Sequence, residues 1–114
     1  MIGRLRRRDD FQLLRSDGRT VRRGPLRVGF RATGVEVDAP GPRVAYAIPR
    51  VVGPAVVRNR IRRRLRAIMV DLARRPQGVP VGDYLVRVSP GAAGSSHDEL
   101  RQHLTGAIDA LADS

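Results

Sequence analysis

The sequence predicts an α+β fold in one domain, with helices packed on a small central sheet. Three segments alternate apolar with other residues at the period of two that marks a β-strand. Two longer segments repeat apolar residues at the helical period, and no linker or internal repeat divides the 114 residues. With a short first helix, the order is α-β-β-α-β-α, and the grouping of strands around one helix favours α+β packing.

The chain begins with a basic segment and a short helix. Residues 1–8 hold four arginines, and we expect them to be disordered. Asp9 or Asp10 caps the helix that follows, and Asp17-Gly18 ends it. After this helix, residues 19–23 are basic and expected to be extended. The apolar residues of the helix are Phe11, Leu13 and Leu14.

Two strands follow, separated by a loop at residues 34–42 that is rich in glycine, proline and acids. Residues 26–32 predict a strand with an apolar face and a basic face. Residues 43–48 predict a second strand, with alanines on one face that suggest close packing there. The apolar faces are Leu26, Val28 and Phe30, then Val44, Tyr46 and Ile48; the opposite faces are Arg27, Gly29 and Arg31, then Ala45 and Ala47.

The most basic part of the chain lies between residues 53 and 66, where six of fourteen residues are arginine and none is acidic. Pro54 suits the first turn of a helix, and Pro76 stops its continuation, so the helix is expected to end at Arg74 or Arg75. Like charges one turn apart weaken a helix by a few tenths of a kcal/mol each. A run without glutamate therefore indicates that this surface is used.

Projection of this helix at 100° per residue separates its faces. An apolar stripe spans an arc of about 80° and is expected to face the core. The stripe consists of Val57, Ile61, Leu65, Ile68 and Leu72. Beside it lies a row of Arg58, Arg62 and Arg66, flanked by Asn59 and Arg63, while Arg60 and Arg64 lie on the other flank.

The last third of the chain predicts a strand and a helix. Residues 76–81 form a connection rich in turn residues, and Tyr84 to Val88 alternate as a strand. After a loop of small residues, Ser96 and Glu99 form a capping box that opens the last helix. The apolar residues of that helix are Leu100, Leu104, Ile108 and Leu111.

The charge of the chain indicates a polyanionic partner. The net charge is +11, and all 22 basic residues are arginine. Nucleic acid is the default partner for such a chain, with a membrane surface as the rival. The apolar runs are too short to span a bilayer, and the start of the chain does not resemble a signal peptide, so we expect a cytoplasmic protein. Cysteine is absent, and codon bias is the favoured explanation for the absence of lysine.

The sequence offers no catalytic constellation. His97 and His103 are six residues apart and have no partners that suggest a metal site or a nucleophile. The Asp9-Asp10 pair is expected to be a helix cap, and Gly53-Pro54-Ala55 lacks the pattern of a phosphate loop. On its residues alone, the chain is a binding protein without catalytic residues or a metal site of its own.

The segment from Arg43 to Arg66 resembles the signature of the bacterial ribonuclease P protein subunit. In that family a strand ending in Val-Ser-Lys-Lys meets a glycine and then Ala-Val-x-Arg-Asn-Arg-x-Lys-Arg-x-x-Arg. The matching residues are Ala55, Val56, Arg58, Asn59, Arg60, Arg63 and Arg66, with Arg50 and Arg62 where the family has lysine. Asp10-Phe11 is similar to the family's entry to the first helix. Departures from the pattern are Arg15, Pro49, Val51, Pro54 and Ala67.

The resemblance implies a single RNA-binding domain over residues 1–114, with a left-handed βαβ crossover against the usual handedness. It implies a protein subunit that binds a catalytic RNA and the 5′ leader of precursor tRNA. The RNA would remove the leader as an endoribonuclease, with Mg²⁺ held mainly by RNA phosphates. The residues expected to bind RNA are Arg50, Arg58, Asn59, Arg60, Arg62, Arg63, Arg64 and Arg66, and those expected in the leader-strand cleft are Phe11, Arg27 and Arg31.

Two alternatives remain open. One is a structural RNA-binding protein, like a ribosomal protein of similar size and charge. The other is a DNA-binding protein that places the basic helix in the major groove. For Phe11, an ordinary core anchor of the first helix is as good an interpretation as a stacking surface. The arginine-rich run after an alternating strand favours ribonuclease P.

Overall fold

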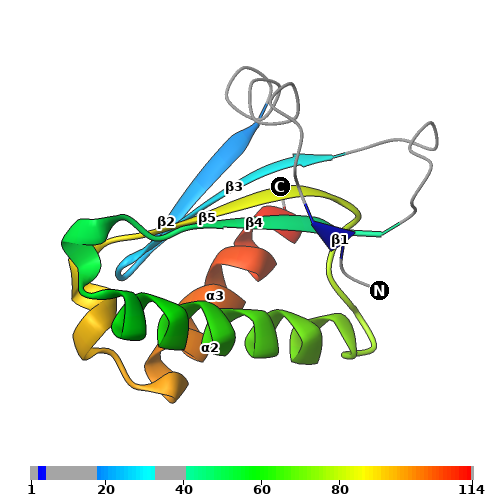
Figure 1. Ribbon diagram of the computed structural model, residues 1–114. Coiled ribbons are helices and arrows are strands. Elements are labelled where there is room, and N and C mark those ends of the chain that lie inside the picture. The colour runs from blue at the N-terminus through cyan, green and yellow to red at the C-terminus, as the bar shows by residue number, and fades with distance from the viewer. Residues whose placement is uncertain (1–2, 5–17, 33–40, 114) are drawn as a thin grey trace.

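The computed structural model describes residues 3–4, 18–32 and 41–113, and within them the chain forms a five-stranded sheet and two α-helices. The strands lie in the order β1-β4-β5-β3-β2 (Figure 1). They are β1 (Gly3–Arg4), β2 (Arg19–Arg23), β3 (Leu26–Ala32), β4 (Arg43–Ala47) and β5 (Gly82–Val88). The helices are α2 (Ala55–Ala73) and α3 (His97–Ala112), with 3₁₀ turns η1 (Arg50–Val52) and η2 (Pro90–Gly94).

The sheet is mixed, and both helices lie on one of its faces (Figure 1). β4 and β5 are neighbours and run parallel, with α2 as the crossover between them, whereas β2, β3 and β5 pair in antiparallel fashion. The predicted α+β class with helices packed on a small sheet is therefore confirmed. The left-handed sense of the crossover stays a prediction from the family resemblance.

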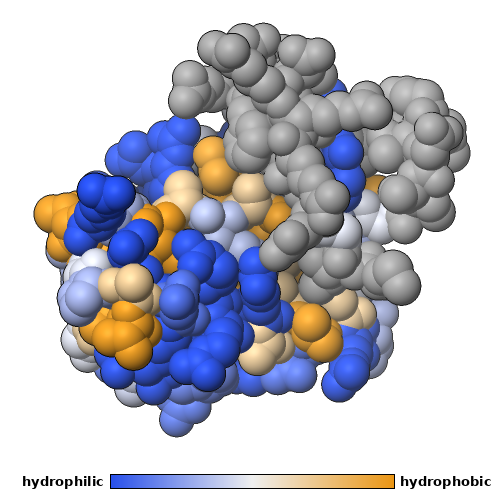
Figure 2. All heavy atoms as spheres, in the orientation of Figure 1, coloured by the Kyte–Doolittle hydropathy of each residue, from blue (hydrophilic) through white to orange (hydrophobic). Residues whose placement is uncertain are grey.

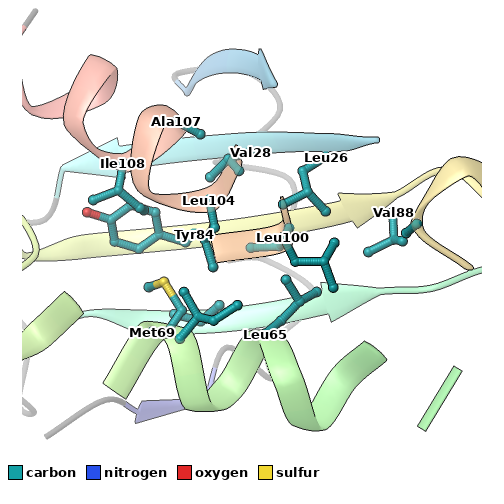
Figure 3. Close-up of a cluster of buried hydrophobic side chains, with 14 of the residues drawn as sticks. Leu26, Val28, Leu65, Met69, Tyr84, Val88, Leu100, Leu104, Ala107 and Ile108 are labelled. Carbon is teal, nitrogen blue, oxygen red and sulfur yellow. The ribbon is translucent and has the colours of Figure 1, made fainter. Parts of the chain in front are cut away.

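The core lies between the sheet and the two helices (Figure 3). Leu65 and Met69 of α2 and Leu100 and Leu104 of α3 are fully buried against Tyr84 of β5. The predicted stripe of α2 faces this core, although Val57 at its start is only half-buried. A chain with few aromatic residues fills the space with aliphatic side chains, which must interdigitate closely because each void loses contacts.

The predicted start of the last helix is confirmed in detail. The Glu99 amide donates to Ser96 Oγ at 3.1 Å, and the Ser96 amide donates to Glu99 Oε1 at 2.9 Å. The hydrogen bond from the Ser96 backbone amide, together with the Ser96 hydroxyl, holds the pKa of the Glu99 carboxyl below its usual value. The four apolar residues predicted for this helix are all buried.

The N-terminal third differs from the predicted order. Residues 19–23, expected to be merely extended, form the edge strand β2, and Gly3–Arg4, within the segment 1–8 expected to be disordered, pair with β4. β2 has one apolar residue, Val21, among four polar ones, so its sequence carries no alternation that would mark a strand. The predicted first helix with Phe11 lies outside the described residues.

A tight turn fixes the register between β2 and β3. Gly24 has a φ of +53°, a conformation that favours glycine, and a Cβ at this position would stand 2.5 Å from the ring of His103 on α3. The turn places Arg22 directly opposite Arg27. Because register decides which side chains share a face, this turn determines the charge pattern described below.

Candidate nucleic-acid interface

The basic helix α2 begins without an acidic residue or a side-chain cap. Its cap is Pro54, which makes no side-chain hydrogen bond, and the first turn contains no acid. The amide groups of that turn therefore add the positive end of the helix dipole to the charge of the arginines. Arg58 Nε donates to the Gly53 carbonyl at 3.1 Å, so this arginine also fastens the start of the helix.

The two flanks of α2 meet different neighbours, as the helix projection predicts. On one flank, the guanidinium of Arg66 lies 6.0 Å from the ring centre of Tyr46 on β4. On the other flank, Arg64 Nη1 lies 3.5 Å from the Ser95 carbonyl, before α3. Arg60 and Arg63 are exposed on the outer side of the helix.

An open hollow of about 900 Å³ runs along the outer side of α2. It is lined by Val56, Asn59, Arg62, Arg63 and Arg66, and Arg62 Nη1 donates to Asn59 Oδ1 at 2.9 Å. Hydrophilic surface covers much of this part of the molecule (Figure 2). Four of the eight residues predicted to bind RNA thus line one hollow, and three of them are arginines, whose guanidinium groups suit phosphate.

Three of the five departures from the family pattern, Pro49, Val51 and Pro54, lie where η1 meets α2. Val51 is 71% exposed and Val56 is 73% exposed, so two apolar side chains stand in solvent beside the arginines. Pro49 and Arg50 are exposed in the same segment. At Val51, where the family pattern has its second lysine, this chain therefore exposes an apolar side chain.

A second basic surface lies on the sheet face opposite α2 and α3, which we call the open face. The strand register places Arg22, Arg27 and Arg87 side by side on β2, β3 and β5, all pointing to this face and all exposed. Ala47 of β4 completes the same row. We call these three arginines the arginine row.

A pocket of about 530 Å³ adjoins the arginine row. All three arginines line it, and its other walls come from the ends of the central strands and the segment before η1. Those walls are Leu26, Ala47, Ile48, Pro49, Val88 and Ser89. Its volume is in the range of small-ligand sites.

The other end of the open face holds an ion cluster instead. Asp83 is fully buried and lies between Arg31 of β3 and Arg43 of β4. Arg43 binds it through two hydrogen bonds, Nε to Oδ1 at 2.8 Å and Nη2 to Oδ2 at 2.9 Å. Arg31 Nη2 approaches Oδ2 at 3.5 Å. The carboxylate thus neutralises one of the two charges and holds both side chains on the sheet.

The structure separates two residues that the sequence assigned to the same cleft. Arg27 and Arg31 share the open face, as predicted, but Arg27 is exposed whereas Arg31 leans on Asp83. Phe11, the third residue of the predicted cleft, lies outside the described residues. The sequence reasoning missed Arg22, Arg87 and Asp83, whose arrangement depends on strand pairing.

Several other arginines serve the fold. Arg19 stacks over Phe30 at 5.7 Å and donates to the Leu111 carbonyl at 3.0 Å. Arg75 pairs with Asp109 at 3.0 Å. Arg101 pairs with Asp71 at 2.6 Å, and this hydrogen bond holds the pKa of Asp71 below its usual value.

The described residues offer neither a metal site nor a membrane span. No group of three or more His, Cys, Asp or Glu side chains gathers within them. In the same part of the chain, neither helix is long and apolar enough to cross a bilayer. His103 packs beside the turn at Gly24, which accords with a structural role.

The fold and its two basic surfaces define a class: a small α+β protein with exposed arginines on a helix and on a sheet face. The family model described as Ribonuclease P matches residues 3–112. The chain therefore belongs to the ribonuclease P protein family, a family of tRNA 5′ processing.

Relatives and solved structures agree with this assignment. The chain is 40% identical to the ribonuclease P protein component of Streptomyces avermitilis, covering 95% of this chain and 90% of the relative. It is 43% identical to that of Rhodococcus opacus, covering 89% and 82%. The structure is similar to the ribonuclease P protein from Thermotoga maritima, with a TM-score of 0.76 at 26% identity over 95% of this chain and 96% of that one. The Staphylococcus aureus protein shares the fold, with a TM-score of 0.80 at 20% identity over 94% and 93%.

Proposed function

We propose that this chain is the protein subunit of a ribonuclease P that binds the catalytic RNA and the 5′ leader of precursor tRNA. The observation that carries the proposal is the run of arginines on α2, which matches the family motif and lies largely on the helix surface. An RNA phosphate backbone is the partner that matches this charge.

Contacts from η1 and α2 would hold the RNA backbone by charge and shape. The proposed residues are Arg50, Arg58, Asn59, Arg60, Arg62, Arg63, Arg64 and Arg66. A guanidinium binds phosphate in a bidentate manner, and the asparagine amide can reach a ribose hydroxyl. Because the flanks of α2 face different neighbours, the two flanks can serve different RNA segments.

The leader strand would lie on the open face of the sheet. Arg27 is exposed there and can contact a phosphate, and Phe11 stays a proposed stacking surface. The sequence assigned Arg31 to the leader-strand cleft. Because Arg31 pairs with Asp83, we propose instead that it stabilises the sheet and does not contact the leader. Of the two arginines that the sequence pattern placed on this face of β3, only Arg27 is therefore an exposed charge.

Chemistry at the scissile phosphate would belong to the RNA. In this proposal, RNA phosphates hold the Mg²⁺ that the reaction needs. The protein would strengthen the binding of substrate and metal by screening the charge of two RNAs held side by side. Because both proposed partners are cytoplasmic RNAs, we also propose a cytoplasmic location.

The test is reconstitution. A bacterial ribonuclease P RNA is combined with the protein and a precursor tRNA at low Mg²⁺, and correct 5′ maturation is measured. We expect the protein to raise the rate well above that of the RNA alone. Binding to the catalytic RNA without any gain in maturation would favour the alternative of a structural RNA-binding protein.

A further inference from the structure

Four apolar side chains are exposed where η1 meets α2, and we call them the valine patch. They lie within six positions of the chain and outside the hydrophobic core. The patch consists of Val51, Pro54, Ala55 and Val56, and its two valines are 71% and 73% exposed. Figure 2 shows apolar surface at the start of α2 with hydrophilic surface around it. Exposed apolar groups that gather within a polar rim mark a site of interaction.

The charge around the valine patch comes from arginine alone. Arg50 and Arg60 are exposed on either side of it, and Arg63 lines the hollow of α2 together with Val56. The sequence contains no acid between residues 39 and 70. An apolar centre with a charged rim is the usual anatomy of a recognition surface, and a rim of one sign favours a partner of the opposite sign.

We propose that the valine patch binds an unstacked nucleobase of the catalytic RNA. This inference rests on the proposed function and adds an apolar contact to the ionic ones. RNA is a polyanion that also offers flat, weakly polar surface, namely the face of a base that has left its stack. The leader is proposed to lie on the open face, whereas Val56 lines the hollow on the outer side of α2, so the base belongs to the catalytic RNA.

Val56 connects the patch to the hollow of α2. It is the second residue of the helix, and it shares the lining of the hollow with Asn59, Arg62 and Arg63. One sugar joins the base and the phosphate of a nucleotide. A base packed on Val56 therefore keeps its phosphate within reach of the guanidinium groups in the hollow.

The comparison with the family pattern shows what the patch exchanges. Val51 stands where the pattern has its second lysine. A lysine at this position would contact a phosphate and release counterions, so its contribution to affinity would fall as the salt concentration rises. An apolar contact removes surface from water and releases no counterions. This chain therefore replaces one ionic contact with a contact that salt does not weaken.

The experiment measures how the protein binds a bacterial ribonuclease P RNA across a range of salt. The patch variant is Val51→Thr with Val56→Thr, which keeps the branched shape and replaces one methyl group with a hydroxyl group at each position. The control is Val70→Thr with Val81→Thr, the same change at two exposed valines outside the patch. Base-specific chemical modification of the bound RNA reports contacts to bases, and hydroxyl-radical cleavage reports contacts to the backbone.

We expect the patch variant to bind the catalytic RNA about tenfold more weakly at every salt concentration, because the surface of two methyl groups is no longer removed from water. The slope of affinity against salt should stay unchanged, since no charge is lost. At least one base should lose its protection from modification while the backbone stays protected. The control should bind as the wild-type protein does, and both variants should keep the wild-type urea midpoint.

Each contrary result has a distinct meaning. Wild-type affinity of the patch variant for the catalytic RNA would overturn the inference and leave the proposed function intact, and a loss confined to precursor tRNA would place the base on the substrate instead. A lower salt slope in the patch variant would also overturn the inference, because the valines would then act through the arginines. Wild-type dimers that the patch variant does not form, seen by sedimentation without RNA, would assign the patch to a second copy of this chain. A wild-type protein that neither binds the catalytic RNA nor raises the rate of maturation would overturn both proposals.

Discussion

The two ends of the open face use the same side chain for different purposes. Arg27 and Arg31 lie on the same strand, on the same face and four residues apart. Arg27 stands opposite Arg87, whereas Arg31 stands opposite Asp83. The residue opposite it on the neighbouring strand therefore determines whether an arginine is exposed to solvent or forms an ion pair that stabilises the fold. In a chain with 22 arginines, composition alone does not separate these roles.

The largest effect is expected from removing the carboxylate that organises the ion cluster. Asp83→Asn leaves Arg31 and Arg43 without their buried counter-charge, and breaking such a cluster destabilises a protein by about 3 kcal/mol. Urea unfolding followed by circular dichroism measures the loss. Asp71→Asn removes a carboxylate from an exposed pair with Arg101 and should cost much less stability, because solvent screens an exposed pair. Equal losses of unfolding free energy for the two variants would mean that the burial of Asp83 does not increase the contribution of its ion pairs to stability.

The second effect concerns the arginines of α2 that have no partner among the described residues. Arg60→Gln with Arg63→Gln should weaken binding of the catalytic RNA about tenfold and lower the salt slope by about two, because both side chains are exposed. Filter binding across salt concentrations measures both quantities. Arg74→Gln with Arg101→Gln removes the same charge from the far end of α2 and from α3, and should change the affinity little. An unchanged slope for the α2 variant would show that this surface does not meet RNA.

The smallest effect is expected at Arg66, whose guanidinium lies over the ring of Tyr46 instead of beside a carboxylate. Burial raises the pKa of Tyr46 to about 12, and the nearby charge of Arg66 partly offsets this rise. Because the pKa in the folded state lies above the unfolded value of 10, this contribution to stability is full below pH 10 and is lost as the pH rises towards 12. Absorbance of the phenolate should show that Arg66→Gln raises the pKa of Tyr46 further. A lower pKa in that variant would mean that Arg66 does not act on the ring by charge.

The sequence predicted those parts of the molecule that depend on local pattern. The buried stripe of α2, the capping box before α3 and the two faces of β3 all follow from the spacing of residues within one segment. The position of the basic helix between two parallel strands also agrees with the family resemblance.

The parts that the sequence did not predict depend on pairing between distant segments. Arg22, Arg27 and Arg87 form a row only because β2, β3 and β5 adopt one register. Asp83 stands at the start of a strand, and nothing in its neighbours along the chain indicates that two arginines from other strands surround it. The sequence did not predict β2 as a strand. β2 lies at the edge of the sheet and its side chains are mostly exposed, so it lacks the alternation of apolar residues that marks a strand.

The most direct test of the contrast between the two ends compares Arg27→Gln with Arg31→Gln. Each variant is measured for urea stability and for the ratio of precursor to leaderless tRNA affinity in the holoenzyme. We predict that Arg27→Gln lowers the affinity ratio and leaves stability unchanged, whereas Arg31→Gln lowers stability and leaves the ratio unchanged. Equal losses of the ratio in both variants would contradict the division of the open face into a phosphate-binding end and a supporting end.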